Sequence, residues 1–225
     1  MEPAHWSLLA ASLTFVGTHF ALSHPLRGPL TRAVGEGPFL GIYSLVALVS
    51  FGWMIWAFLE APAPDLPGAG DAAWVLASAL TIVALALFLG SFRKNPAFPD
   101  PTGRTMIPAA PRGVFLITRH PMMWGFALWA MAHIIVFWSM RTLILAGAIL
   151  FLALVGAHLQ DRKKQRLLGD KWRAWQAQTS YWPRLDRLGA PGAGLWLLAV
   201  VLWLAVTWAH MPAGGIPAGL WRWIG

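Results

Sequence analysis

The sequence predicts an all-α fold: a polytopic membrane helix bundle of about six transmembrane helices with a basic interfacial helix. Three observations predict it: 57% of the residues are hydrophobic, only 12% are charged, and long apolar runs recur along the chain. An ordinary soluble domain carries about 45–50% apolar and roughly 25% charged residues. No polar block is large enough for a separate globular core, so residues 1–225 are expected to form a single domain.

Six apolar runs approach the length of about 20 residues that crosses a hydrocarbon core of roughly 30 Å. They are Trp6 to Ser23, Phe39 to Leu59, Ala73 to Phe92, Pro121 to Trp138, Thr142 to Leu159 and Gly194 to Met211. The first run lacks the basic region and cleavage site of a signal peptide, so we expect it to remain as a helix. Two proline-rich stretches, 61–70 and 95–111, are expected to be loops because proline removes a backbone donor.

The basic residues divide the connections between these runs into two groups. Fifteen of the 17 Lys and Arg residues fall at 25–37, 93–119 and 161–189, and the other connections are nearly free of them. The positive-inside rule assigns the basic connections to the cytoplasm. We therefore expect both termini to face outward.

Residues 161–181 are expected to form the interfacial helix. Basic side chains alternate there with Leu167, Leu168, Trp172 and Trp175, as in helices that lie among lipid headgroups. In so apolar a chain the net charge of +8 indicates membrane lipids as partners, and no nucleic-acid motif is present. The absence of cysteine excludes disulfides and thiolate ligands, which leaves histidine as the main metal ligand.

Histidine dominates the polar residues within the apolar runs, where polar groups usually face a bundle interior. His19 lies in the last turns of the first run and His133 lies deep in the fourth. His133 shares a helical face with Phe126 and Trp129, which would suit a planar macrocycle, although a hydrogen bond to a neighbouring helix explains it as well. His120 precedes a proline, and either helix initiation or a functional role accounts for it.

Four ordered motifs resemble one family. They read HFALSHPLR at 19–27, GEGPFLGIYSL at 35–45, RHPMMWGFALWAMAH at 119–133 and HLQDRKKQRLLGDKW at 158–172. Together they resemble the NnrU family of bacterial membrane proteins, which is related to plant and cyanobacterial 15-cis-zeta-carotene isomerase. The resemblance covers about residues 10–185, leaves out the last run at about 194–211, and implies a multi-pass protein of the bacterial inner (cytoplasmic) membrane.

This resemblance implies haem b, bound by two histidines that map to His19 and His133. Arg27 matches the family's first motif. Arg27, Arg112 and Arg119 are candidates to pair with the carboxylates of haem or of another cofactor, and positive-inside anchoring is the alternative for each. The isomerase has a redox-linked cysteine where this chain has Ala130. The implied function is either redox-gated isomerisation of a lipid-soluble polyene or an accessory role in nitrogen-oxide respiration.

The predicted depths of the two ligands disagree. His19 lies close to the cytoplasmic end of its run, whereas His133 lies about 12 residues, or roughly 18 Å, into its own. Two ligands of one iron must lie at similar depth. If these two are not partners, His120 or His24 is the substitute ligand.

The same stretch is also similar to membrane methyltransferases that act on isoprenylcysteine or phospholipids with S-adenosylmethionine. That likeness predicts a cytoplasmic site lined by Arg119, His120, Gln160, Asp161 and Arg173. Those enzymes commonly have a Glu-Glu pair where this chain has Gln160 and Asp161, which weakens the likeness. The third alternative is a non-catalytic assembly or carrier protein.

Overall fold

A computed structural model describes residues 2–62, 68–98 and 107–224, and every regular element in these ranges is a helix. The long helices are α1 (Pro3–Ser23), α3 (Glu36–Glu60), α4 (Asp71–Gly90), α5 (Pro121–Val136), α6 (Met140–Leu168) and α8 (Ala193–Gly214). The short ones are α2 (Arg27–Val34), η1 (Gly113–Leu116), α7 (Asp170–Gln178), η2 (Leu185–Arg187) and α9 (Trp221–Ile224). The prediction of an all-α polytopic bundle is confirmed.

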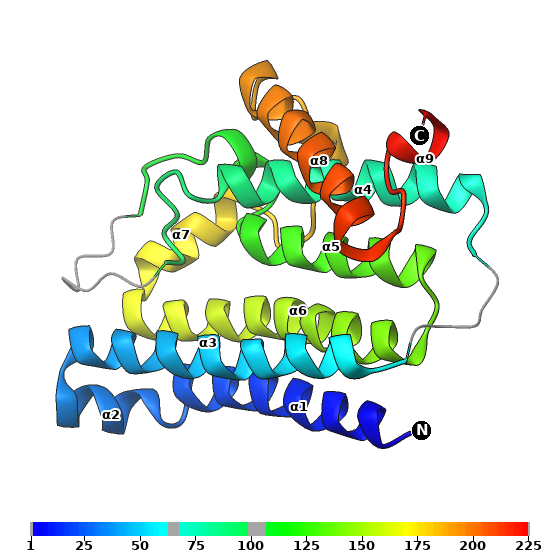
Figure 1. Cartoon of the computed structure of the whole chain (residues 1–225). Coiled ribbons are helices and arrows are strands. Elements are labelled where there is room, and N and C mark those ends of the chain that lie inside the picture. The colour runs from blue at the N-terminus through cyan, green and yellow to red at the C-terminus, as the bar shows by residue number, and fades with distance from the viewer. Residues whose placement is uncertain (1, 63–67, 99–106, 225) are drawn as a thin grey trace.

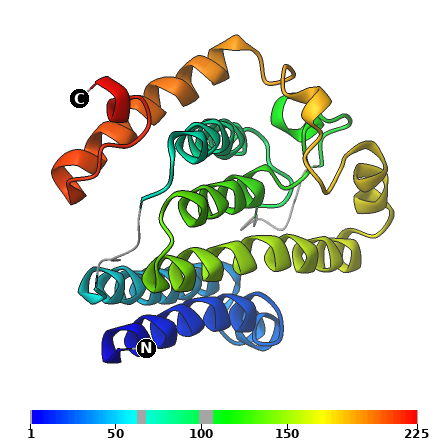
Figure 2. The ribbon, with the colours of Figure 1, turned by 90° about the vertical axis from the view of Figure 1, so that its right-hand side faces the viewer.

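The long helices pack in a simple order. α1 and α3 pack against each other and against α6, α6 packs against α5, α5 against α4, and α4 against α8. Figures 1 and 2 show α1 and α3 on one side of the molecule and α8 crossing obliquely on the other. Both termini lie at one end of the bundle, and α2 and α7 lie at the other (Figure 1). We call the α2 and α7 end the basic end, because it carries the charged last turns of α6.

Among the described residues, five helices are long and apolar enough to cross a membrane: α1, α3, α4, α6 and α8. The remaining predicted span, at 121–138, forms the shorter helix α5, which ends at Val136. Its 16 residues extend about 24 Å, less than a hydrocarbon core of roughly 30 Å. Since α5 packs between α4 and α6, this shorter length does not leave it isolated in lipid.

The interfacial helix expected at 161–181 is divided between two elements. Residues 161–168 continue α6, because no helix-breaking residue occurs before Gly169, whose φ is 53°. The remainder forms α7, where Trp172 and Trp175 are 0% and 1% exposed. These two rings pack into the protein core beside Phe115 and Leu87 instead of facing lipid.

The interior contains two apolar clusters. One, at the basic end, joins α4, η1, α5, α6 and α7, and its buried members are Leu87, Val114, Phe115, Ile117, Trp124, Ala127, Ala153, Trp172 and Trp175. The other, toward the opposite end, joins α1, α3 and α6 through Leu8, Ala11, Met54, Ala57, Ala61 and Leu145. We call these the basic-end cluster and the opposite-end cluster.

Candidate functional site

A cavity of about 970 Å³ lies between α1, α3, α5 and α6, beside the opposite-end cluster. Its walls are mainly apolar, with aromatic rings from Phe15, Phe20, Phe39, Tyr43, Phe51, Phe98 and Phe126. Phe15 and Ile149 line the cavity and also pack against the opposite-end cluster, so that cluster bounds it on one side. Ligand pockets commonly measure about 300–1,000 Å³. The cavity is therefore large enough for a bulky organic ligand.

Three imidazoles line this cavity: His19, His24 and His120. Nδ1 of His19 lies 2.7 Å from the carbonyl oxygen of Phe15, one helical turn earlier. A ring that donates Nδ1–H to this carbonyl keeps a lone pair on Nε2, which is the usual state of a metal-bound histidine. The rings of Phe15 and Tyr43 lie against His19 and hold its orientation.

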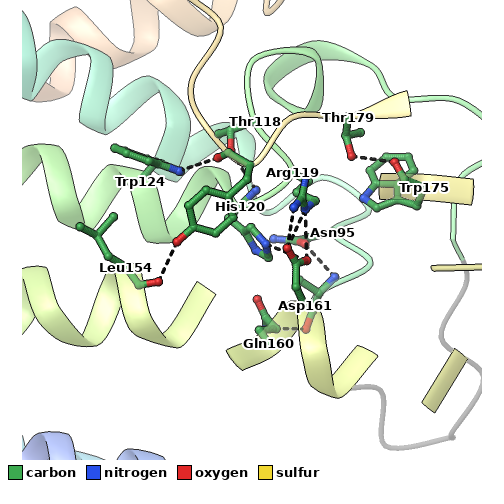
Figure 3. Close-up of polar contacts among 12 residues, drawn as sticks. Asn95, Thr118, Arg119, His120, Trp124, Leu154, Gln160, Asp161, Trp175 and Thr179 are labelled. Carbon is green, nitrogen blue, oxygen red and sulfur yellow. Dashed lines mark hydrogen bonds and ion pairs between the residues drawn. The ribbon is translucent and has the colours of Figure 1, made fainter. Parts of the chain in front are cut away.

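Beside the cavity, Arg119 and Asp161 form a largely buried ion pair. Nε of Arg119 lies 3.1 and 2.9 Å from the two oxygens of Asp161, and Nη2 lies 2.7 Å from Oδ2. Side-chain exposure is 12% for Arg119 and 9% for Asp161. Figure 3 shows both side chains and His120 pointing toward one another. This pair links the start of α5 to the charged end of α6.

His120 has one nitrogen at this ion pair and one without a partner. Its Nε2 lies 2.9 Å from Oδ1 of Asp161, and its side chain is fully buried. Among the described residues neither ring nitrogen makes a hydrogen bond of good geometry, and of the two only Nε2 has a charged neighbour. A buried polar atom without a partner is costly and calls for an explanation. Because His120 lines the cavity, a ligand there is the natural partner for its second nitrogen.

The segment after α7 holds the segment that contains His120 in place. The carbonyl of Tyr181 accepts hydrogen bonds from the Thr118 hydroxyl and the Trp124 indole, both at 2.8 Å. The amide of Arg119 donates to Ser180 O at 2.8 Å, and the Tyr181 hydroxyl donates to Leu154 O at 2.8 Å. Residues about 60 positions apart in the sequence thus fix each other.

The charges in this cluster act against the effect of burial. The carboxyl of Asp161 lies in the charged turns of α6, beyond the apolar stretch that ends at Leu159. Burial raises the pKa of Asp161. The contacts with His120 and Arg119 lower this pKa by a larger amount, and the result is a value of about 2. Burial and the Asp161 charge raise the pKa of the Tyr181 hydroxyl. Asp161 is therefore ionised at neutral pH and holds Arg119 and His120 together.

His133 lies elsewhere and does not line the cavity. Its Nδ1 lies 2.8 Å from Trp129 O, and its ring is 6.4 Å from that of His210 in α8. Trp129 packs on the opposite-end cluster. His19 lies four residues before the end of α1, near the basic end, whereas His133 lies 12 residues, about 18 Å, after the start of α5, which runs toward the termini (Figure 1). The structure therefore does not bring His19 and His133 to one depth.

The predicted basic residues are only partly brought together. Arg27 lines the cavity and forms an ion pair with Glu36, and Arg119 is committed to Asp161. Among the residues suggested by the methyltransferase likeness, Gln160 lines the cavity and donates to Ala97 O at 3.1 Å. Arg173 is exposed and pairs with Asp170 on α7.

Sequence reasoning missed two lysines that line the cavity, Lys163 and Lys164. The sequence pattern places both in a basic helix that lies among lipid headgroups. Their helical register was the available signal, because residues 156, 160, 163, 164 and 167 share one face of a continuous helix. The partner of that face is set by tertiary packing, which the sequence pattern does not contain.

The fold and the cavity define a class: a polytopic α-helical membrane protein with a histidine-lined internal cavity. The family model described as NnrU protein matches residues 7–218, nearly the whole chain. The chain belongs to the NnrU family. The match extends beyond residues 10–185 and includes α8. No curated protein and no solved structure matches the chain.

Haem b, which the resemblance to the isomerase implies, can be tested against these residues. The pair His19 and His133 does not fit one iron, because the two residues differ in depth. The pair His19 and His120 fits better, since both side chains line one cavity. The unpartnered Nδ1 of His120 and the carbonyl-bonded ring of His19 are the states expected of imidazole ligands.

Proposed function

We propose that this NnrU-family protein binds haem b in the cavity, with His19 and His120 as the iron ligands. The observation that carries the proposal is the buried, unpartnered nitrogen of His120 in the wall of a large aromatic cavity that also contains His19. In this arrangement Nε2 of His120 faces Asp161, and Nδ1 is the nitrogen left for a ligand. Asp161 then orients the imidazole as outer-shell carboxylates orient metal-bound histidines.

The chain's own residues supply binding, orientation and a dry environment. The aromatic wall excludes water, Phe15 and Tyr43 fix the ring of His19, and Asp161 fixes that of His120. When bound, haem supplies one-electron chemistry whose potential depends on the axial ligands and their hydrogen bonds. The two roles implied by the resemblance, polyene isomerisation and support of nitrogen-oxide respiration, would both use this site.

The methyltransferase alternative is supported by the proximity of Arg119, His120 and Asp161 (Figure 3). However, Arg119 and Asp161 are paired with each other, so neither is free to bind the amino-acid end of S-adenosylmethionine. Arg173, which that alternative requires, is exposed on α7 and paired with Asp170. We therefore place haem binding first.

The test is the absorbance of the full chain purified in detergent from cells supplied with haem precursor. We expect a Soret band and haem close to one per chain, lost or spectrally altered in His19→Ala and His120→Asn. Thermal unfolding of each variant separates loss of haem from loss of fold. His210→Ala serves as the control and should keep the wild-type spectrum.

His133→Ala decides between the two ligand pairs. If His120 is the second ligand, this variant keeps its haem, whereas the pair implied by the resemblance predicts loss. Haem content unchanged in His19→Ala would reject the site altogether. A colourless wild-type protein that binds S-adenosylmethionine would replace the haem proposal with the methyltransferase alternative.

A further inference from the structure

The end of the cavity nearest α2 gathers positive charge from several elements. The charged side chains that line the cavity are Arg27 from α2, Glu36 from α3, and Lys163 and Lys164 from α6. They comprise three cations and one carboxylate, and the imidazole of His24 lies in the same wall. We call Arg27, Lys163 and Lys164 the cationic mouth of the cavity.

Two of these three cations have a partner within the protein, and Lys163 does not pair with an anion among the described residues. Arg27 is paired with Glu36, and Nζ of the buried Lys164 lies 3.3 Å from Phe98 O. Within the part of the chain that the structure describes, Lys163 forms neither a hydrogen bond nor an ion pair. It is nevertheless partly buried and lines the cavity. A cation in such a place is costly unless an anion joins it.

Most of the surroundings of Lys163 disfavour its charged form. Burial lowers the pKa of Lys163, the charges of Arg27 and Lys164 lower it further, and Glu36 raises it, with a result of about 8. The pKa of His24 is lowered by burial and by Lys163 and Arg166. Arg27, Lys163 and Lys164 therefore repel one another, and a bound anion would reduce this repulsion.

We infer that the cationic mouth binds the carboxylates of the cavity ligand, with Lys163 as their main partner. The inference rests on the proposed haem site and adds the orientation of its ligand. The acidic edge of the ligand faces α2 and the last turns of α6, and its apolar body faces Phe15 and Phe51. Haem b has this form, because its carboxylates lie along one edge of an apolar macrocycle. Arg27 and Lys164 complete the anion site.

A pH signature follows from the chemistry of Lys163. Its ammonium is present below a pKa of about 8 and is lost as the pH rises through that value, and a bound anion moves the transition upward. Affinity for an acidic ligand should therefore fall on the alkaline side. No titratable group gains positive charge as the pH rises, so the neighbours Arg27, Glu36, His24 and Lys164 do not reverse the sign.

The experiment compares haem b with its dimethyl ester, which keeps the macrocycle and the iron but has no carboxylate. Both are titrated into the ligand-free full chain in micelles, at neutral pH and at a pH well above the lysine pKa. We expect Lys163→Gln to weaken haem binding at least about tenfold and to leave binding of the ester unchanged. Ester binding thus also shows that the variant is folded.

Two matched variants complete the design. Lys163→Arg should keep the affinity for haem and remove most of its decline at alkaline pH, because a guanidinium stays charged. Arg162→Gln removes the same charge from the neighbouring, exposed position outside the cavity and should change neither ligand. A uniform effect of net charge would instead appear in both Gln variants.

The outcomes separate this inference from the proposed function. If haem and its ester both bind through His19 but Lys163→Gln has the wild-type preference between them, the orientation inferred here is wrong and the haem site stands. If neither ligand binds the wild-type chain, both proposals fail together. Equal alkaline decline for haem and ester would also reject Lys163 as the carboxylate partner.

Discussion

The two halves of the bundle are built differently. Toward the termini, α1, α3 and α6 meet through Leu8, Ala11 and Met54, each 0% exposed, and the interior is packed. Toward the basic end, the same three helices line a cavity whose wall contains imidazoles and cations. The helices are continuous through both halves, so the difference comes from their side chains and not from their paths.

Between α1, α3 and α6, this difference separates a packed region from a region with room for a ligand, while α4, α5, α6 and α7 form the basic-end cluster beside it. A packed apolar cluster holds helices together through dispersion contacts. A cavity in the same bundle forfeits those contacts, and the buried ion pair of Arg119 and Asp161 beside it needs both partners to offset its desolvation. Features that cost stability are retained where they serve a site.

Topology gives the largest contrast between the two ends. Reporter fusions at Gly68 and at the C-terminus should read as external and one after Asp186 as cytoplasmic, because 15 of 17 basic residues lie in the connections of the basic end. Paired periplasmic and cytoplasmic reporters give all-or-none signals. A cytoplasmic C-terminus would place the cationic mouth and the terminus on the same side and contradict the arrangement.

Much of the fold was predictable because it depends on local apolar runs. Every predicted span corresponds to a helix, since about 20 apolar residues in lipid have few alternatives to helix. What failed depends on packing. Residues 161–168 were separated from the fifth span because their charges suggested a surface, yet Lys164 is buried there.

The site was harder to predict than the fold. Sequence reasoning found His19, His120 and Arg27, all of which line the cavity, because polar residues in apolar runs are conspicuous. It also paired His19 with His133, and only the relative depth of α1 and α5 argues against that pair. The contacts of Tyr181 with Thr118 and Trp124 join distant segments, and no sequence period encodes them.

Removing one partner of the buried ion pair should have the largest effect on stability. Arg119→Gln leaves Asp161 ionised without its bidentate partner and should lower the free energy of unfolding by about 3–5 kcal/mol. Thermal unfolding in micelles measures this. Arg173→Gln breaks the exposed Arg173–Asp170 pair and serves as the control, with an expected loss below about 1 kcal/mol. Equal losses of unfolding free energy in the two variants would show that the buried ion pair stabilises the fold no more than the exposed one.

Truncating the packed half should cost more than truncating the cavity wall. Leu8→Ala opens a void in a fully buried cluster and should lower stability by about 2–4 kcal/mol. Phe51→Ala removes more atoms, but from a ring that is 40% exposed and already borders the cavity, so its cost should be smaller. The same unfolding measurement compares them. A larger loss in Phe51→Ala would mean that the ligand-free cavity closes and packs.

The smallest effect expected is that of one hydroxyl at the edge of the polar cluster. Tyr181→Phe removes the donor to Leu154 O and keeps the ring that lies against His120 and Trp124. The Leu154 carbonyl belongs to α6 and retains its helical hydrogen bond, so no buried acceptor is left unpaired. The loss should therefore be about 1 kcal/mol, the net value of an ordinary hydrogen bond. Tyr43→Phe is the matched control, because its hydroxyl accepts only a long 3.4 Å contact from Ser23 and should matter less. A loss in Tyr181→Phe comparable to that in Arg119→Gln would show that the segment after α7, and not the ion pair, holds the basic end together.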